Sequence, residues 1–277
     1  MSRRILSIVG VFLLLGAAMA LAQEASNTPA TPVPAASDYD VNCSGFISGA
    51  KLPMDIYVVD GVDNEFHAPL RQYTGGDYVF LNQRAGTNYA VGAEYSLLRL
   101  GSEIFRTSRY DGEHRYLRSL GTPYVDVGRV KVTQVTQQGA VAQVTFACGA
   151  IYPGDFALPY KPREIPQYTP TKDFDRFAPA NGKKHGGIVA GRNNPAVFEK
   201  GSIAYINLGA SDGVQAGQVF RIYHAEPLIM GGLLYYPEKP RESVGEMVIL
   251  STQEKSSVGI VVRSLRDINV AEGVELE

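Results

Sequence analysis

Residues 203–223 read IAYINLGASDGVQAGQVFRIY, and this stretch decides the fold class. Residues 204–206 are all apolar and residues 219–222 are apolar except at Arg221, and short runs of this kind are typical of β-strands. Between these runs, the pair Asp212 and Gly213 is typical of a tight turn, as is a second glycine four positions later. The stretch therefore predicts two strands joined by a shaped turn.

The same pattern occurs 125 positions earlier in the chain. Residues 78–97 align with residues 203–222 without a gap, and this places Gly92 at the position of Gly217. Repeated alternation and repeated turn glycines are what a common backbone requires of two sequences. We infer that the chain contains a duplicated β unit.

The alignment extends to both sides of this stretch. Before it, residues 188–190 align with residues 57–59, which predicts one further strand in each copy. After it, residues 128–146 align with residues 245–263 at an offset of 117 positions. Each copy is expected to contain five to six strands. A small closed or semi-closed barrel suits this number, because closure removes exposed sheet edges.

The chain begins with the features of a secretory signal peptide. Two arginines precede an apolar run over residues 5–15, and small residues end in Ala-Leu-Ala at positions 20–22. This order predicts export and cleavage after Ala22, with no transmembrane segment afterwards. An uncleaved N-terminal anchor is the alternative. Residues 23–40 are rich in Pro, Ala, Ser and Thr, so we expect a flexible tether there.

Composition agrees with an all-β chain. The sequence has 16 Tyr, 11 Phe and 29 Gly, a mixture that favours short strands with many turns. We predict two tandem, internally duplicated small β-barrel-like domains after the signal peptide and tether. The expected parts are the signal peptide 1–22, the tether 23–40, the first β-barrel-like repeat 41–158, a Pro-rich linker 159–181 and the second repeat 182–277.

Charge and histidine spacing exclude several classes of function. Cleavage removes two arginines and no acid, which changes the net charge from −2 to −4. A chain without a basic stripe is a poor partner for nucleic acid. The four histidines are scattered singly, so a metal site has no local support. We expect no cofactor, and no group of residues in the sequence forms a catalytic constellation.

The chain has two cysteines, Cys43 and Cys148. An exported chain folds in an oxidising compartment, and an even number of cysteines favours pairing. The sequence predicts a disulfide between them, with two buried free thiols as the alternative. Cα atoms more than about 7 Å apart would exclude the bridge.

The turn residues are predicted to be structural. Asn88 aligns with Gly213, and both residue types readily take a left-handed backbone conformation. Turn chemistry alone accounts for these types, although ligand binding is an alternative for Asp212 and for the paired Asn82 and Asn207. The predicted structural turn residues are Asn88, Gly92, Asp212, Gly213 and Gly217.

Each copy carries an insertion, and the two insertions share no pattern. They span residues 100–127 and 225–244. Divergent, aromatic-rich loops on a repeated scaffold are common binding sites, whereas the alternative is a loop that only covers the end of a barrel. The candidate binding residues are Tyr110, Arg115, Tyr116, Tyr235 and Tyr236.

Three runs in the second copy support a resemblance to known families. They are AYINLGASDGVQAGQVFRIY, VGEMVILSTQEKSSVGIVVRS and INVAEGVEL. They resemble the C-terminal domain of flagellar assembly protein T and the modules that follow LysM domains in bacterial envelope proteins. The turn is also similar, more weakly, to the β domains of rod shape-determining protein C. The resemblance covers residues 182–277, and residues 44–158 through the internal repeat.

The resemblance implies a non-enzymatic assembly or scaffold role in the periplasm. We therefore expect a scaffold or adaptor of the bacterial cell envelope, with an envelope protein or a peptidoglycan-associated molecule as its partner. The alternative is a small-ligand-binding protein or a hydrolase whose site is assembled only in three dimensions. A deep pocket holding titratable groups with strongly shifted pKa values would favour that alternative.

Overall fold

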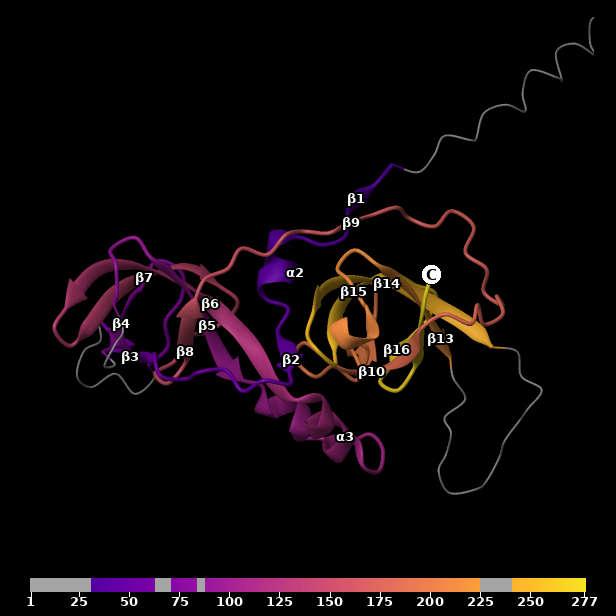
Figure 1. Ribbon diagram of the computed structural model, residues 1–277, viewed down its shortest axis with the longest axis horizontal. Coiled ribbons are helices and arrows are strands. Elements are labelled where there is room, and N and C mark those ends of the chain that lie inside the picture. Colours follow the sequence, from indigo (N-terminus) through magenta and orange to yellow (C-terminus); the bar gives the residue numbers. More distant parts are fainter. Residues whose placement is uncertain (1–30, 63–70, 84–87, 225–240) are drawn as a thin grey trace, which may run out of the picture. The chain divides into compact units, whose positions relative to one another are not determined.

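Figure 1 shows the computed structural model, which describes residues 31–62, 71–83, 88–224 and 241–277. The chain divides into two compact units. Residues 34–168 and 174–277 form one of them, and residues 31–33 and 169–173 belong to the other. Both repeats lie in the first of these units, which is mostly β.

The first repeat is a seven-stranded antiparallel sheet. Six strands follow the order β3-β4-β7-β6-β5-β8, and β2 (Phe46–Ser48) pairs with the beginning of β6. The six are β3 (Val58–Gly61), β4 (Tyr78–Asn82), β5 (Glu94–Leu100), β6 (Thr122–Thr136), β7 (Gly139–Ala147) and β8 (Phe156–Pro159).

The second repeat is a closed barrel of six strands in the order β10-β12-β15-β14-β13-β17. The strands are β10 (His185–Gly191), β12 (Ile203–Ile206), β13 (Val219–His224), β14 (Glu242–Thr252), β15 (Ser257–Ser264) and β17 (Gly273–Leu276). The short strands β11 (Val197–Phe198) and β16 (Ile268–Asn269) pair with each other.

The remaining elements are short. They are β1 (Val33–Pro34), α2 (Asp38–Asn42), the 3-10 helix η1 (Ser102–Phe105), α3 (Glu113–Leu120), β9 (Gln167–Tyr168) and the 3-10 helix η2 (Ala210–Asp212). Both η1 and α3 lie in the insertion between β5 and β6, and η2 lies in the turn that follows β12.

The six strands of the two repeats follow the same order, but only the second repeat closes. β10 pairs with β17 along residues 185–187, whereas the first repeat has an isolated bridge between Tyr57 and Phe156 at the corresponding place. β3 has four residues, whereas β10 has seven. β3 is therefore too short to pair with β8 as β10 pairs with β17. The edges of the first repeat are joined only around this bridge, where the N–H of Ala157 donates to the carbonyl of Ile56 (2.8 Å). The second repeat is therefore a closed barrel, whereas the first is an antiparallel sheet that is only semi-closed.

The register of the first strand corrects the sequence alignment by one residue. Val58 pairs with Leu81, and Ile188 pairs with Ile206, which corresponds to Leu81. Val58 therefore corresponds to Ile188, which the alignment had placed at Tyr57. Residues 57–59 and 188–190 are apolar throughout, so alternation could not fix the register there. The error matters because a slip of one residue exchanges the two faces of a strand.

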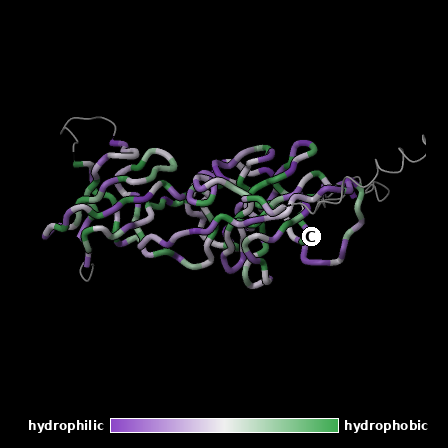
Figure 2. The backbone as a smooth tube through the Cα atoms, turned by 90° about the horizontal axis from the view of Figure 1, so that it is seen from above, coloured by the Kyte–Doolittle hydropathy of each residue, from purple (hydrophilic) through white to green (hydrophobic). Residues whose placement is uncertain are grey.

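The interiors of the two repeats are built in the same way. A Cβ atom at Gly61 would lie 2.2 Å from the ring of Tyr73, and one at Gly191 would lie 2.3 Å from the ring of Phe198. Each glycine thus leaves room for one aromatic ring in the core. Figure 2 shows hydrophobic and hydrophilic residues interspersed along the chain.

Part of the predicted tether is folded. The backbone N–H of Ala35 donates to the carbonyl of Pro166 (2.8 Å), and Ser37 forms a capping box with Asp40 at the start of α2. Val41 on α2 is buried. The predicted C-terminal boundary of the tether was too late in the chain. The capping residues of a short helix are the same small polar types that are common in a flexible segment.

The predicted turn residues are in place in the second repeat. Gly213 and Gly217 have φ angles of +74° and +86°, and Gly92 in the first repeat has +88°. The Asp212 carboxylate accepts a hydrogen bond from the N–H of Gly209 (2.9 Å), which is a structural role. Asn88 directly follows residues 84–87, which lie outside the described residues, so its left-handed conformation stays a prediction.

Replacing Gly217 with valine is expected to lower the free energy of unfolding by about 2 kcal/mol, since a β-branched residue at positive φ is strained. Chemical denaturation of residues 23–277 would measure this loss. Gly75→Val is the matched control, because Gly75 faces open space and lacks a positive φ, while a Cβ at Gly217 meets other atoms only at ordinary contact distances of 3.7 Å and above. Equal stability of the two variants would contradict the proposed turn.

Candidate functional site

The insertion of the first repeat folds as η1, a loop and α3. Ile104, Leu117 and Leu120 on its inner side are buried. Arg109 in the loop donates to the carbonyl of Pro195 (2.8 Å), and its guanidinium also reaches the side chain of Asn194 (2.7 Å). The inner side of the insertion is thus fixed to the second repeat.

The outer side of the insertion carries the candidate residues of the first repeat. Tyr110 precedes α3, and Arg115 and Tyr116 are exposed on it. The Tyr116 hydroxyl accepts a hydrogen bond from the amide of Asn207. Partial burial raises the pKa of Tyr110, and the nearby charge of Glu113 adds to this effect. The structure therefore places Arg115 and Tyr116 on one helix and Tyr110 in the loop before it.

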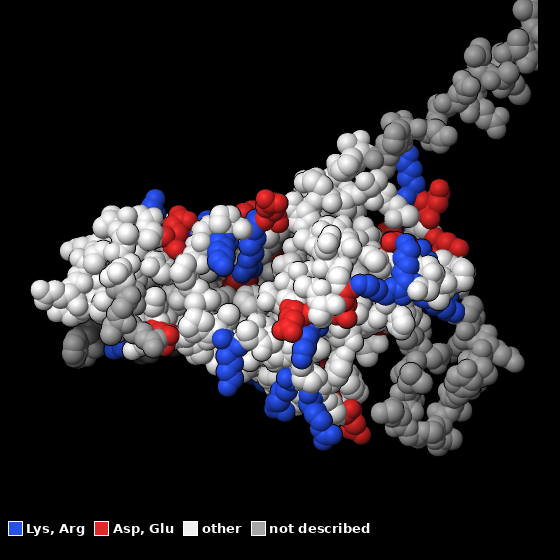
Figure 3. Space-filling view, viewed as in Figure 1, with Lys and Arg blue, Asp and Glu red and all other residues white. Residues whose placement is uncertain are grey.

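Further cationic side chains extend this surface. Arg118 lies over the ring of Phe105 at 5.0 Å, and Arg106, the residue after Phe105, is exposed and forms an ion pair with Glu103 (3.8 Å). Figure 3 shows several Lys or Arg side chains gathered over α3, with fewer acidic ones among them. We call Arg106, Arg115 and Arg118 the arginine face. Tyr235 and Tyr236, the candidates of the second insertion, lie outside the described residues.

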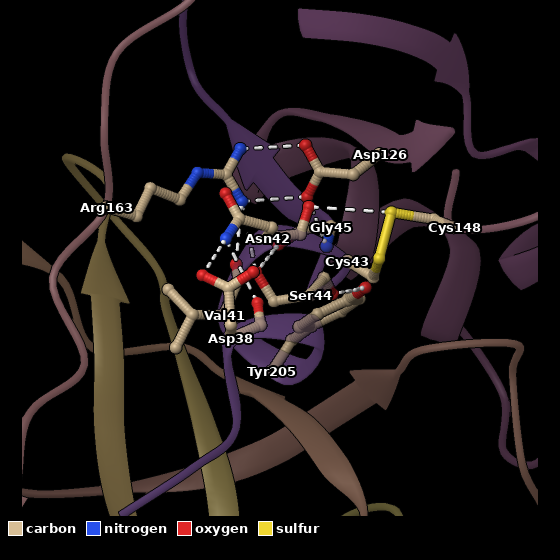
Figure 4. A network of polar contacts seen from close by, with 10 residues as sticks. All are labelled: Asp38, Val41, Asn42, Cys43, Ser44, Gly45, Asp126, Cys148, Arg163 and Tyr205. Carbon is tan, nitrogen blue, oxygen red and sulfur yellow. Dashed lines mark hydrogen bonds and ion pairs between the residues drawn. A yellow bond between two sulfur atoms is a disulfide. The ribbon is translucent and has the colours of Figure 1, made fainter. Parts of the chain in front are cut away.

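A disulfide joins Cys43, which follows α2, to Cys148, which follows β7 (Figure 4). The Cα atoms are 5.4 Å apart, so the predicted bridge is confirmed and the alternative of two free thiols is excluded. A stable disulfide is typical of an oxidising compartment outside the cytoplasm.

A buried carboxylate lies next to this disulfide. Asp126 on β6 accepts a hydrogen bond from the N–H of Gly45 (2.9 Å) and two from the guanidinium of Arg163 (2.7 and 2.8 Å). Arg163 also donates to the carbonyl of Val41 (3.0 Å). Because Arg163 belongs to the Pro-rich linker, this ion pair fixes the linker to the first repeat, as Figure 4 shows.

Tyr205 on β12 connects the barrel to the segment that follows α2. Its hydroxyl donates to the carbonyl of Ser44 (2.8 Å), and its burial raises its pKa, so it stays a neutral donor. The hydroxyl of Ser256 donates to the carbonyl of Ile47 (2.7 Å). The segment after α2 therefore contacts both repeats through buried hydrogen bonds.

An apolar cluster surrounds these hydrogen bonds. The first repeat contributes buried side chains from α2, β2, η1 and α3, and the barrel contributes residues from its outer face. The barrel residues are Val189, Ala190, Ile203, Tyr205, Val248, Leu250, Val258 and Ile260. One side of the barrel is thereby covered by the first repeat.

A groove of about 440 Å³ lies beside this junction. Its lining includes Arg99, Asp126 and Tyr152 from the first repeat and Asn193 and Tyr205 from the second. Arg99 donates to both carboxylate oxygens of Asp155 (2.6 and 2.7 Å), and Asp126 is held by the linker arginine. The buried charges of the groove are therefore paired, which suits binding by hydrogen bonds better than proton transfer.

The Arg99–Asp155 pair has a counterpart in the second repeat. There, Nδ1 of His224 lies 3.5 Å from Oε1 of Glu272. Burial raises the pKa of Glu272, and its hydrogen bond with His224 only partly opposes this effect. Three residues later, burial also acts to raise the pKa of Glu275, but hydrogen bonds from Arg241 and the N–H of Asn181 lower it below the ordinary value. The two carboxylates should respond to pH in opposite directions.

Glu272→Gln and Glu275→Gln test this difference. A raised pKa in the folded state stabilises the protein at low pH, and this stabilisation is lost as pH rises through the folded pKa. Glu272→Gln should therefore gain stability relative to the unchanged protein as pH rises from about 4 to about 7. Glu275→Gln should lose stability at about pH 7, and its deficit should shrink as pH falls below about 4. Denaturation at a series of pH values checks both trends, and parallel curves for the two variants would contradict them.

Within the described ranges, no group of three His, Cys, Asp or Glu side chains could hold a metal ion. No helix in that part of the chain is long and apolar enough to cross a membrane. No protein-family model matches the chain, and no curated protein is similar enough in sequence to count as a match.

Sequence reasoning missed the residues that hold the junction together: Arg109, Asp126, Arg163, Asn194 and Tyr205. Asp126 was detectable, because an acid inside the apolar run YVDVG is typical of a buried ion pair. Arg163 and Asn194 lie in segments of ordinary turn and linker composition. Their partners are far away in the sequence, and no local pattern could identify them.

Proposed function

We propose that this protein is a non-enzymatic, exported scaffold or adaptor of the bacterial cell envelope, periplasmic or envelope-associated, which binds a protein or cell-wall partner through its insertions. One observation carries the proposal. The insertion between β5 and β6 is anchored by its inner side, while its outer side exposes arginines and tyrosines.

The composition of this outer side suits recognition. Arg and Tyr are enriched at the energetic centres of protein interfaces. Arg115 is exposed on α3, so its charge is available to a partner. Anchoring through Arg109 and Leu117 holds the surface in one conformation, which lowers the entropic cost of binding.

Three further features support the compartment and the role. The N-terminal sequence has the order of a signal peptide, and the disulfide suits an oxidising environment. The resemblance of the second repeat to assembly modules of envelope proteins points to a scaffold. The paired charges of the groove give no additional reason to propose hydrolysis.

Capture from an envelope extract tests the proposal. Residues 23–277 are immobilised, captured molecules are identified by mass spectrometry, and the purified partner is titrated against variants. Arg115→Glu with Arg118→Glu should weaken binding at least about tenfold, while circular dichroism stays unchanged. Lys200→Glu with Lys255→Glu is the control of equal charge change on the second repeat. Equal binding by all three proteins, or equal loss in the control, would refute the role of the arginine face.

A further inference from the structure

The first repeat exposes an apolar patch on its outer face. Val59, Val62, Tyr78 and Phe80 are 46%, 41%, 37% and 38% exposed. They lie side by side, because β3 and β4 are paired and the N–H of Val62 donates to the carbonyl of Tyr78 (2.9 Å). All four are partly exposed among the described residues. We call these four residues the β3–β4 patch.

The corresponding residues of the second repeat are buried. The strand pairings make Val59, Tyr78 and Phe80 correspond to Val189, Ile203 and Tyr205, which are 2%, 2% and 5% exposed. What covers them is known, since α2, β2, η1 and α3 of the first repeat pack there. The same scaffold position is therefore a covered interface in one repeat and an open apolar surface in the other.

We infer that the β3–β4 patch is a docking surface for a second copy of this chain. In the covered interface, the insertion of one repeat packs on the outer face of the next repeat. The second repeat has its own insertion at the corresponding place, residues 225–244. The first repeat of a second copy supplies an outer face on which this insertion can pack.

The sequence of the second insertion fits an apolar surface. It contains LIMGGLLYY at residues 228–236, without a charged residue, and residues 225–240 lie outside the described part. Burial of such side chains against exposed valine and aromatic residues is favourable by about 25 cal/mol per Å². The occupant of the patch is thus this segment of a neighbouring copy.

The rest of the outer face limits the strength of the contact. Lys131 and Gln143 stand where the second repeat has Val248 and Ile260. Charged and amide side chains keep this part soluble in a single copy, so the association is concentration-dependent. Because the two contact surfaces differ, the contact is head-to-tail and can continue along a row of copies.

Sedimentation of residues 23–277 over a range of concentrations tests the inference. The unchanged protein should self-associate, and Phe80→Glu should raise the dissociation constant at least about tenfold. Leu233→Glu with Leu234→Glu should have the same effect from the other side of the contact. Leu265→Glu is the control, because Leu265 is 52% exposed outside the patch. Tyr78→Ser replaces Phe80→Glu if the latter does not fold.

Mixing distinguishes this contact from other arrangements. A Phe80→Glu copy keeps an intact second insertion, and a copy with Leu233→Glu and Leu234→Glu keeps an intact β3–β4 patch. The insertion of the first can dock on the patch of the second, so their mixture should form dimers and no larger assemblies. A monomer at every concentration would overturn the inference. So would self-association that depends on Phe80 but not on the insertion, since it would indicate patch-to-patch pairing. Self-association should survive Arg115→Glu with Arg118→Glu, which separates this inference from the proposed function.

Discussion

Replacing Cys43 and Cys148 with serine is expected to lower the free energy of unfolding by about 4 to 5 kcal/mol. The bridge closes a loop across 105 positions, and in the chain-entropy model a loop of this size restricts the unfolded chain to that extent. The loss should appear in chemical denaturation as a lower midpoint and, because the unfolded chain becomes more extended, as a steeper dependence on denaturant.

The reduced form of the unchanged protein is the control for this double substitution. It should lose about the same stability as the serine variant, because both remove the same covalent link. The single variants Cys43→Ser and Cys148→Ser should match the double variant under reducing conditions. A loss below about 1 kcal/mol would show that the unfolded chain is already restricted by other means.

Replacing Asp126 with alanine is expected to lower the free energy of unfolding by about 3 kcal/mol. The change leaves Arg163 and the N–H of Gly45 without their buried acceptor, and breaking one side of a buried ion pair typically costs about 3 to 5 kcal/mol. The lower end applies because the side chain of Arg163 is 27% exposed and can reach water.

A double-mutant cycle separates the pair from other effects at Asp126. With Arg163→Met in the background, Asp126→Ala should cost much less, since no guanidinium is left unpaired. The loss of stability caused by Asp126→Asn should lie between the losses caused by Asp126→Ala in the unchanged protein and in the Arg163→Met background. An amide oxygen can still accept a hydrogen bond from the N–H of Gly45. Equal cost of Asp126→Ala with and without Arg163 would assign the loss to packing and to the hydrogen bond from Gly45, with no contribution from the ion pair.

The matching strands and turns of the two repeats could be predicted, because they depend on local residue patterns and turn chemistry. The asparagines illustrate this. Asn82 accepts from the N–H of Tyr57, and Asn207 accepts from the N–H of Gly187, both at 2.7 Å. Their shared place in the alignment was visible in the sequence, and so was their structural role, since side chains of this type commonly satisfy backbone groups.

What could not be predicted depends on contacts between distant residues. Nothing near Glu113 shows that it is buried and paired with Arg109, because a charged pair of this spacing is usually a solvated helix surface. The closure of one repeat and not the other depends on the length of β3, and sequence patterns fix strand ends poorly. The arginine face was visible only in part, since Arg115 was selected while Arg106 and Arg118 were not.

The disulfide also determines how the molecule carries mechanical load. Tension applied at the N-terminal segment passes from Cys43 through the two sulfur atoms to Cys148, so residues 44–147 are not stretched. Fully extended, these residues would span about 350 Å, and the disulfide prevents a pulling force from releasing this length. The second repeat contains no cysteine and bears the same force through its hydrogen-bonded strands. A molecule tethered by its N-terminus and pulled from the far end would therefore extend in the barrel, while strands β2 to β7, which lie between the two cysteines, stay intact.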